Sequence, residues 1–244
     1  MMANLPRRLI GEILGTVFLL AAVVGSGVMA QKLAGGNAAL ALLGNTLSTG
    51  AILTVLILTF SPLSGAHFNP AVSIAFALRR ELPWSGAAAY VAAQVIGGIA
   101  GVWIAHAMFE LPVWQVSLNV RTGLGQWLAE FFATFGLLLT ILGCIERTPA
   151  AVPYAVGLYI TSAYWFTAST SFANPAVTIA RSISDTFAGI APAAAPAFIA
   201  AQLAGMLAAV ALSGWLWPRV RAEIGHPNRS RYKAATAGTG FAFL

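Results

Sequence analysis

Charged residues are scarce in this chain, since only 8% of its 244 residues are Asp, Glu, Lys or Arg and 59% are hydrophobic. An ordinary soluble domain carries about 25% charged residues, so the composition excludes that class of protein. A helix that crosses the hydrocarbon core of a bilayer needs about 20 mostly apolar residues. We therefore expect about six spans in one membrane domain over residues 1–218.

Residues suited to catalysis or metal binding are also few. Cys144 is the only cysteine, which excludes an intrachain disulfide and a CxxC motif. The three histidines and seven acidic residues provide no metal-ligand motif and no nucleophile with an adjacent base. We therefore expect a protein that is not an enzyme and that binds neither a cofactor nor a metal ion.

The excess of positive charge indicates membrane topology. A net charge of +6 would suggest nucleic-acid binding in a soluble chain, but the cytoplasmic loops of membrane proteins are enriched in Lys and Arg. With both termini inside, the basic residues left outside are Lys32, Arg121 and Arg181. The remaining ten lie inside: Arg7, Arg8, Arg79, Arg80, Arg147, Arg219, Arg221, Arg229, Arg231 and Lys233. This bias predicts cytoplasmic termini and no nucleic-acid partner.

The C-terminal segment 219–244 differs from the rest of the chain. It mixes basic residues with Gly, Ala and Thr and lacks a helical apolar stripe. We expect a disordered cytoplasmic tail, whose charges contact lipid or set the topology rather than bind nucleic acid.

Eight apolar segments fall into two length classes. Six are long enough to cross a bilayer, at about residues 9–30, 40–60, 86–108, 126–145, 152–170 and 194–217. Two are too short, at 69–78 and 174–184, and each opens with Asn-Pro. Because Pro is favoured at the first position of a helix, we expect two half-helices that enter the membrane without crossing it.

The two halves of the chain match each other in the same order. The matched pairs are Glu12 with Glu130, Thr16 with Thr134, Asn69-Pro70-Ala71 with Asn174-Pro175-Ala176, Gln94 with Gln202, and Gly97 with Gly205. They define repeats over about 7–108 and 125–217. Each repeat holds three spans, an odd number, so the second repeat is inverted in the membrane. The N-termini of the two half-helices should then meet near the midplane.

The paired Asn-Pro-Ala blocks predict a conduction path. Irregular backbone at membrane depth is tolerated only where it is buried in protein or lines a wet cavity. Each helix N-terminus carries roughly half a positive charge, so two opposed tips should repel cations and protons. The amides of Asn69 and Asn174 can donate hydrogen bonds into the path. A water oxygen that accepts from both has no acceptor capacity left, which breaks a proton wire.

At these residues the chain resembles the major intrinsic protein family, the aquaporins and aquaglyceroporins, over about residues 7–217. The matching features are Ser64-Gly-Ala-His67-Phe-Asn69-Pro-Ala-Val, Ala173-Asn174-Pro-Ala-Val and the buried polar set Glu12, Glu130, Gln94 and Gln202. The resemblance implies an all-α membrane protein with six transmembrane helices and two re-entrant half-helices. It also implies a homotetramer in the lipid membrane, with one pore per subunit and passive flux of water or small neutral solutes.

Three ionisable residues each have two possible roles. Carboxylates inside spans often mark a proton relay, but we expect Glu12 and Glu130 to accept hydrogen bonds from the loops that carry the half-helices, because such bonds offset the cost of burial. His67 either lines the cytoplasmic vestibule or holds its loop, and the sequence leaves both open.

The outer filter departs from the family pattern. In most members an Arg follows the second Asn-Pro-Ala, whereas this chain has Val177. The other filter positions, carried over by spacing, fall on Thr49, Ser162 and Ser171. All four are small and uncharged, which predicts a wide mouth, since pore diameter and lining donors set selectivity.

A wide mouth favours glycerol-like polyols, urea and metalloid hydroxides such as arsenite over strict water selectivity. A few bacterial members that lack this arginine, some encoded beside arsenic-resistance genes, look most like this chain, so we expect a bacterial inner membrane. Arg181 lies four residues beyond Val177. It either forms a helix-surface ion pair with Asp185 or touches the vestibule above the filter.

Three other functions remain as alternatives. One is a water-selective aquaporin. A second is a secondary transporter, since transporters also use inverted repeats with half-helices at the midplane, although no paired ionisable residues lie near the half-helix tips. A third is a structural membrane protein with a closed pore, which the small filter residues disfavour.

Overall fold

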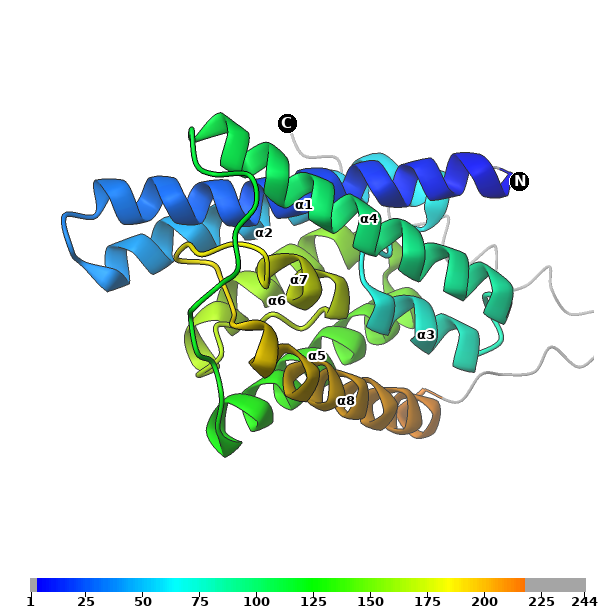
Figure 1. The fold of residues 1–244 in the computed structure, drawn as a ribbon. Coiled ribbons are helices and arrows are strands. Elements are labelled where there is room, and N and C mark those ends of the chain that lie inside the picture. The colour runs from blue at the N-terminus through cyan, green and yellow to red at the C-terminus, as the bar shows by residue number, and fades with distance from the viewer. Residues whose placement is uncertain (1–3, 218–244) are drawn as a thin grey trace, which may run out of the picture.

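The computed structural model describes residues 4–217 and confirms the all-α fold for that part of the chain (Figure 1). The helices are α1 (Leu5–Leu33), α2 (Ala38–Ser64), α3 (Pro70–Leu78), α4 (Trp84–Met108), α5 (Leu124–Arg147), α6 (Val152–Phe166), α7 (Pro175–Arg181) and α8 (Ala195–Leu216). Two 3-10 turns, η1 (Pro149–Ala151) and η2 (Pro192–Ala194), precede α6 and α8. The tail expected over 219–244 lies outside the described residues.

Within residues 4–217, five helices are long and apolar enough to span a membrane: α1, α2, α4, α5 and α8. The segment expected at 152–170 is shorter, because α6 ends at Phe166 after 15 residues. At 1.5 Å per residue this helix is about 22 Å long, less than the roughly 30 Å hydrocarbon core. Residues 167–170 belong instead to the loop that leads to α7.

The two half-helices begin where the Asn-Pro pattern predicts. Asn69 caps α3 by accepting a hydrogen bond at Oδ1 from Ala71 N (2.9 Å). Asn174 caps α7 in the same way, from Ala176 N (3.0 Å) and Val177 N (3.2 Å). The helices contain nine and seven residues, about 13 and 10 Å of length, so neither can cross a bilayer. Helix α7 ends three residues earlier than expected, because the chain leaves the helix after Arg181.

Glycine sets the distance between the long helices of each repeat. A Cβ atom on Gly97 of α4 would lie 2.5 Å from the carbonyl oxygen of Ile13 in α1. A Cβ atom on Gly205 of α8 would lie 2.2 Å from the carbonyl oxygen of Phe131 in α5. Such small residues let helix backbones approach closely in membrane proteins. The two helix pairs, α1 with α4 and α5 with α8, lie side by side in Figure 1.

A buried carboxylate holds the loop before α3. Glu12 of α1 is fully buried. Its Oε1 accepts hydrogen bonds from Ser64 Oγ (2.6 Å) and His67 N (3.0 Å). Its Oε2 accepts from Phe68 N (2.7 Å) and Gln94 Nε2 (2.8 Å). These four bonds use the roughly four acceptor sites of a carboxylate.

Glu130 of α5 holds the loop before α7 in the same manner. Its Oε1 accepts from Phe172 N (2.8 Å), and its Oε2 accepts from Ala173 N (2.9 Å) and Gln202 Nε2 (2.6 Å). The same Gln202 nitrogen donates to Thr178 Oγ1 on α7 (2.9 Å). Hydrogen bonds between these side chains therefore connect α5 and α8 to the half-helix α7 and to the loop before it.

The carboxylate of Glu130 should be needed for stability. In Glu130→Gln, the amide NH2 group would replace one oxygen and face either Phe172 N or the donors of Ala173 and Gln202, so we expect a loss of about 3 kcal/mol, the cost of an unsatisfied buried group. The matched control Glu110→Gln alters an exposed side chain and should change nothing. The melting temperatures of both variants in detergent check this expectation. Equal melting temperatures would show that the loop does not depend on the carboxylate.

The close crossing of α5 and α8 offers a second check. Gly205→Ala would place Cβ against the Phe131 carbonyl, so the helices must shift at a cost of about 1–3 kcal/mol. Gly214→Ala in the same helix meets no atom within 4 Å and should be neutral or slightly stabilising, because Ala favours helix over Gly. Thermal unfolding of the purified variants measures the difference, and an unaffected Gly205→Ala would contradict the packing argument.

Candidate functional site

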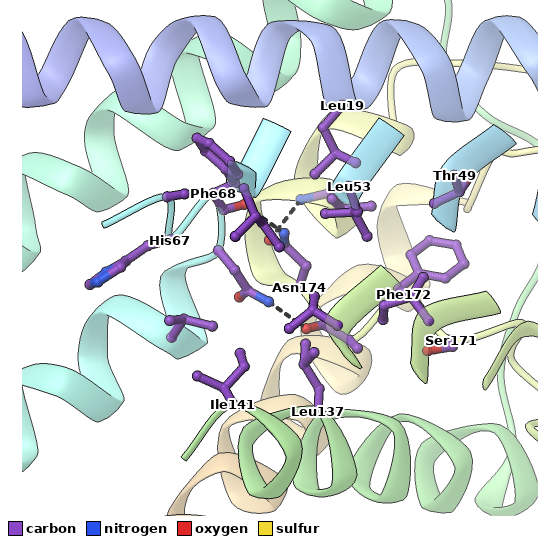
Figure 2. A pocket seen from close by; sticks show the side chains of 18 of the residues that line it. Leu19, Thr49, Leu53, His67, Phe68, Leu137, Ile141, Ser171, Phe172 and Asn174 are labelled. Atoms are coloured by element: carbon purple, nitrogen blue, oxygen red, sulfur yellow. Dashed lines mark hydrogen bonds between the residues drawn. The ribbon is translucent and has the colours of Figure 1, made fainter. Parts of the chain in front are cut away.

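A cavity of about 110 Å³ lies between the two repeats. Its walls come from α1, α2, α5 and α6 and from the half-helices with their loops. Twelve of the 25 lining residues are Leu, Ile or Val: Leu19, Val23, Leu53, Ile57, Val72, Leu137, Ile141, Ile145, Val152, Val156, Ile160 and Val177. In Figure 2, His67 lies toward one end of this cavity, Thr49 and Ser171 lie toward the other, and Asn174 lies between them.

The two Asn-Pro-Ala blocks meet at the middle of the cavity. Asn69 Nδ2 donates to the carbonyl oxygen of Ala173 (2.8 Å), and Asn174 Nδ2 donates to that of Phe68 (2.8 Å) (Figure 2). Each asparagine thus bonds to the loop of the other repeat. An amide nitrogen carries two hydrogens, so one hydrogen of each side chain remains, and both residues line the cavity. The sequence argument assigned these amides to the path alone and did not foresee their crossed bonds.

The loops before the half-helices hold non-glycine residues in the left-handed region. The φ angles are +52° at Ala66 and +50° at Phe68 in the first loop, and +49° at Ser171 and +48° at Ala173 in the second. Such a conformation costs of order 1 kcal/mol or more and persists where the surroundings over-determine it. The hydrogen bonds from these loops to the two buried glutamates supply that constraint.

Three of the four expected filter residues line the cavity, namely Thr49, Ser171 and Val177. The expected position of Ser162 is wrong, because this side chain is exposed and its Oγ donates to the carbonyl oxygen of Tyr159 (2.8 Å). A helix turns about 100° per residue. An assignment that errs by two residues therefore places a side chain on nearly the opposite face of α6.

Helix α6 presents Tyr164 to the cavity instead. Val156, Ile160 and Tyr164 follow one another at four-residue intervals and all line it. Leu158 and Trp165 of the same helix are apolar and exposed, so apolar periodicity alone could not identify the inward face. The hydroxyl of Tyr164 donates to Thr49 Oγ1 (3.4 Å). The expectation of a wall made only of small residues is therefore wrong at this end.

Arg181 also lines the cavity and is only 2% exposed. Its Nε donates to the carbonyl oxygen of Ala188, and its guanidinium carbon lies 3.4 Å from the centroid of the Phe172 ring. The expected ion pair with Asp185 does not form, because α7 ends at Arg181 and the two residues do not share a helix. Asp185 instead accepts a hydrogen bond from Leu118 N (2.9 Å).

His67 lines the opposite end of the cavity. Its Nδ1 lies 3.1 Å from Ser73 Oγ on α3, and its ring packs 4.7 Å from Phe76 and 5.2 Å from Tyr90 between centroids. The two readings that the sequence left open therefore coexist: the ring borders the cavity and is fixed to the half-helix. Among residues 4–217, no group of three His, Cys, Asp or Glu side chains could hold a metal ion.

Comparisons with known proteins agree with this geometry. The Major intrinsic protein family matches residues 2–151. The chain is 58% identical over 213 residues to "Aquaglyceroporin AqpS" of Rhizobium meliloti (strain 1021), covering 87% of this chain and 91% of that protein. It is 34% identical over 151 residues to "Nodulin-26" of Glycine max, covering 61% of this chain and 55% of that protein.

Among solved structures, the fold is similar to that of the aquaglyceroporin from Plasmodium falciparum, with a TM-score of 0.66 and 24% identity. That match covers 87% of this chain and 95% of the other. With the inverted half-helices, the central asparagines and the family match in agreement, the chain belongs to the major intrinsic protein family of membrane channels for water and small solutes.

Proposed function

We propose that this chain forms a passive channel for water and small uncharged solutes, namely glycerol-like polyols and metalloid hydroxides such as arsenite. The observation that carries the proposal is the division of the cavity wall into aliphatic side chains and a few polar groups around Asn69 and Asn174. A polyol can place its hydrocarbon edge on the aliphatic wall and its hydroxyls on the amides. An ion would lose its hydration shell there with little in return.

Val177 supports passage of solutes larger than water. It stands where most family members have Arg, it is buried, and it lines the cavity. An arginine at this position would add five N–H donors and a fixed charge, together with considerable volume. Its absence leaves room for a solute whose hydroxyls bond to Thr49 and Ser171 on the same lining.

A water-selective channel is the second candidate. Tyr164 and Arg181 are large, and both lie on the lining of the cavity with Thr49 and Ser171. A narrow mouth with strong donors favours water over larger solutes. The two candidates therefore differ in whether these side chains leave a path wide enough for glycerol.

We also propose the setting in which the channel works. The bias of basic residues predicts that both termini are cytoplasmic, and the similar protein of Rhizobium meliloti favours a bacterial inner membrane. Family resemblance favours a homotetramer with one pore per subunit, surrounded by lipid.

Uptake of water, glycerol and arsenite into one preparation of reconstituted vesicles tests the proposal. We expect all three to exceed the uptake of protein-free vesicles, with rates proportional to the solute gradient. Water uptake alone would establish the water-selective candidate. Saturation at low solute concentration, or dependence on an ion gradient, would indicate a transporter, and absence of any flux would indicate a closed pore.

Restoring an arginine at the filter gives a sharper prediction. Val177→Arg should lower glycerol flux by roughly tenfold while water flux changes less, because added donors and volume penalise the larger solute. Val177→Ala, which keeps the position small and uncharged, is the matched control and should retain glycerol flux. Swelling of vesicles in a glycerol gradient measures both, and equal glycerol flux in a folded Val177→Arg variant would refute the filter assignment.

A further inference from the structure

Two guanidinium groups meet one aromatic ring at the Thr49 end of the cavity. The guanidinium carbons of Arg181 and Arg121 lie 3.4 and 5.3 Å from the centroid of Phe172. Arg181 ends the half-helix α7, whereas Arg121 belongs to the loop between α4 and α5. A cation over an aromatic face is favourable, so the ring holds both guanidinium groups, of which Arg181 lines the cavity.

Neither charge is neutralised by an ion pair. Within residues 4–217, neither guanidinium lies within 4.0 Å of a carboxylate oxygen, whereas Arg79 pairs with Glu81 and Glu146. Arg121 donates instead to backbone carbonyls, including that of Gly189 (2.8 Å). The buried Arg181 and the half-buried Arg121 therefore bring two positive charges to this end of the cavity, against the single carboxylate of Glu130 that interacts with both.

Arg181 keeps unused hydrogen-bonding capacity. Its Nη1 is buried and makes no hydrogen bond to any residue in the described part of the chain, and the same holds for Ser171 Oγ. A buried donor without a partner is costly. These atoms therefore gain most from the oxygen of a water or solute molecule that reaches them.

The internal repeat shows that Arg181 has no charged counterpart at the equivalent position of the first repeat. With the offset of 105 residues that relates Asn69 to Asn174, Phe172 corresponds to His67 and Arg181 corresponds to Phe76. Both pairs make the same kind of contact, since the ring of His67 packs 4.7 Å from that of Phe76. The fold thus places one close pair of side chains at each end of the cavity, and within these aligned pairs only the second repeat has a guanidinium.

We propose that Arg181, held over Phe172 and reinforced by Arg121, is a cation and proton barrier of this pore in addition to the opposed half-helix tips. The inference rests on the proposed function, because it takes the cavity to be the conduction path. Positions 177 and 181 are one helical turn apart, about 6 Å along α7. The loss of an arginine at 177 therefore widens the path at that level without removing positive charge from it.

Proton flux into vesicles tests the barrier. The full-length protein is reconstituted with an internal pH-sensitive dye, and a pH gradient is applied with K+ and valinomycin to clamp the potential. Wild-type vesicles should conduct water and remain as tight to protons as protein-free vesicles. Arg181→Gln, which keeps a donor for the Ala188 carbonyl but removes the charge, should raise proton flux by roughly tenfold, the order expected for one charge near the path.

Two variants separate charge from structure. Arg181→Lys retains the charge and should stay close to wild type in proton flux. Arg147→Gln makes the same change at an exposed residue and should leave proton flux and water flux as they are. A leak in Arg181→Lys equal to that in Arg181→Gln would overturn the proposal, because the barrier would then depend on shape and not on charge.

Moving the charge gives an independent readout. In the double variant Arg181→Gln with Val177→Arg, we expect the proton flux to fall back to the wild-type level. A merely structural role for Arg181 would not produce this recovery. Water flux shows that each variant is folded, and Arg181→Met carries the same test if Arg181→Gln conducts no water. An Arg181→Gln pore that conducts water and stays proton-tight would overturn the proposal. Absence of glycerol flux in the wild type would instead refute only the proposed solute class.

Discussion

The whole arrangement depends on satisfying the backbone of two loops that lie inside the protein at membrane depth. A peptide N–H in that environment has no water to bond to, and these loops also contain residues with positive φ. Glu12 and Glu130 resolve both problems, because each carboxylate accepts hydrogen bonds from two successive loop N–H groups. A charged acceptor makes stronger bonds than a neutral one, which explains why a carboxylate is kept inside a span despite its cost.

The repeat turns this local solution into a pore. Asn69 and Asn174 follow the constrained loops and bond to the carbonyl of the opposite loop at 2.8 Å each. Neither repeat can complete its centre alone, because the acceptor for each amide belongs to the other. The central geometry is therefore nearly symmetric, and differences between the two ends arise from side chains farther along the half-helices, such as Phe76 and Arg181.

The sequence predicted those features that are local or repeated. Span positions follow from apolar runs, and the half-helix starts follow from Asn-Pro, so the structure agrees with them within a few residues. The rotation of α6 about its axis was not accessible from spacing, and Ser162 was placed inside where Tyr164 lies. Likewise, the position at which α7 ends decides whether Arg181 contacts Asp185 or Phe172. The end of a helix depends on tertiary contacts, which residue spacing in the sequence does not reveal.

In the proposed pore, volume and charge belong to separate positions, which gives a property that one arginine cannot have. An arginine at 177 would narrow the path and repel cations together, so neither effect could change without the other. Val177 and Arg181 both line the cavity, one turn apart on α7; in the proposed pore Val177 sets the width at its level and Arg181 carries the charge. Coulomb repulsion falls only as 1/r, so it still acts several ångströms from the charge. Steric exclusion, in contrast, acts only at contact. A displaced charge can therefore still repel cations after the constriction has been removed.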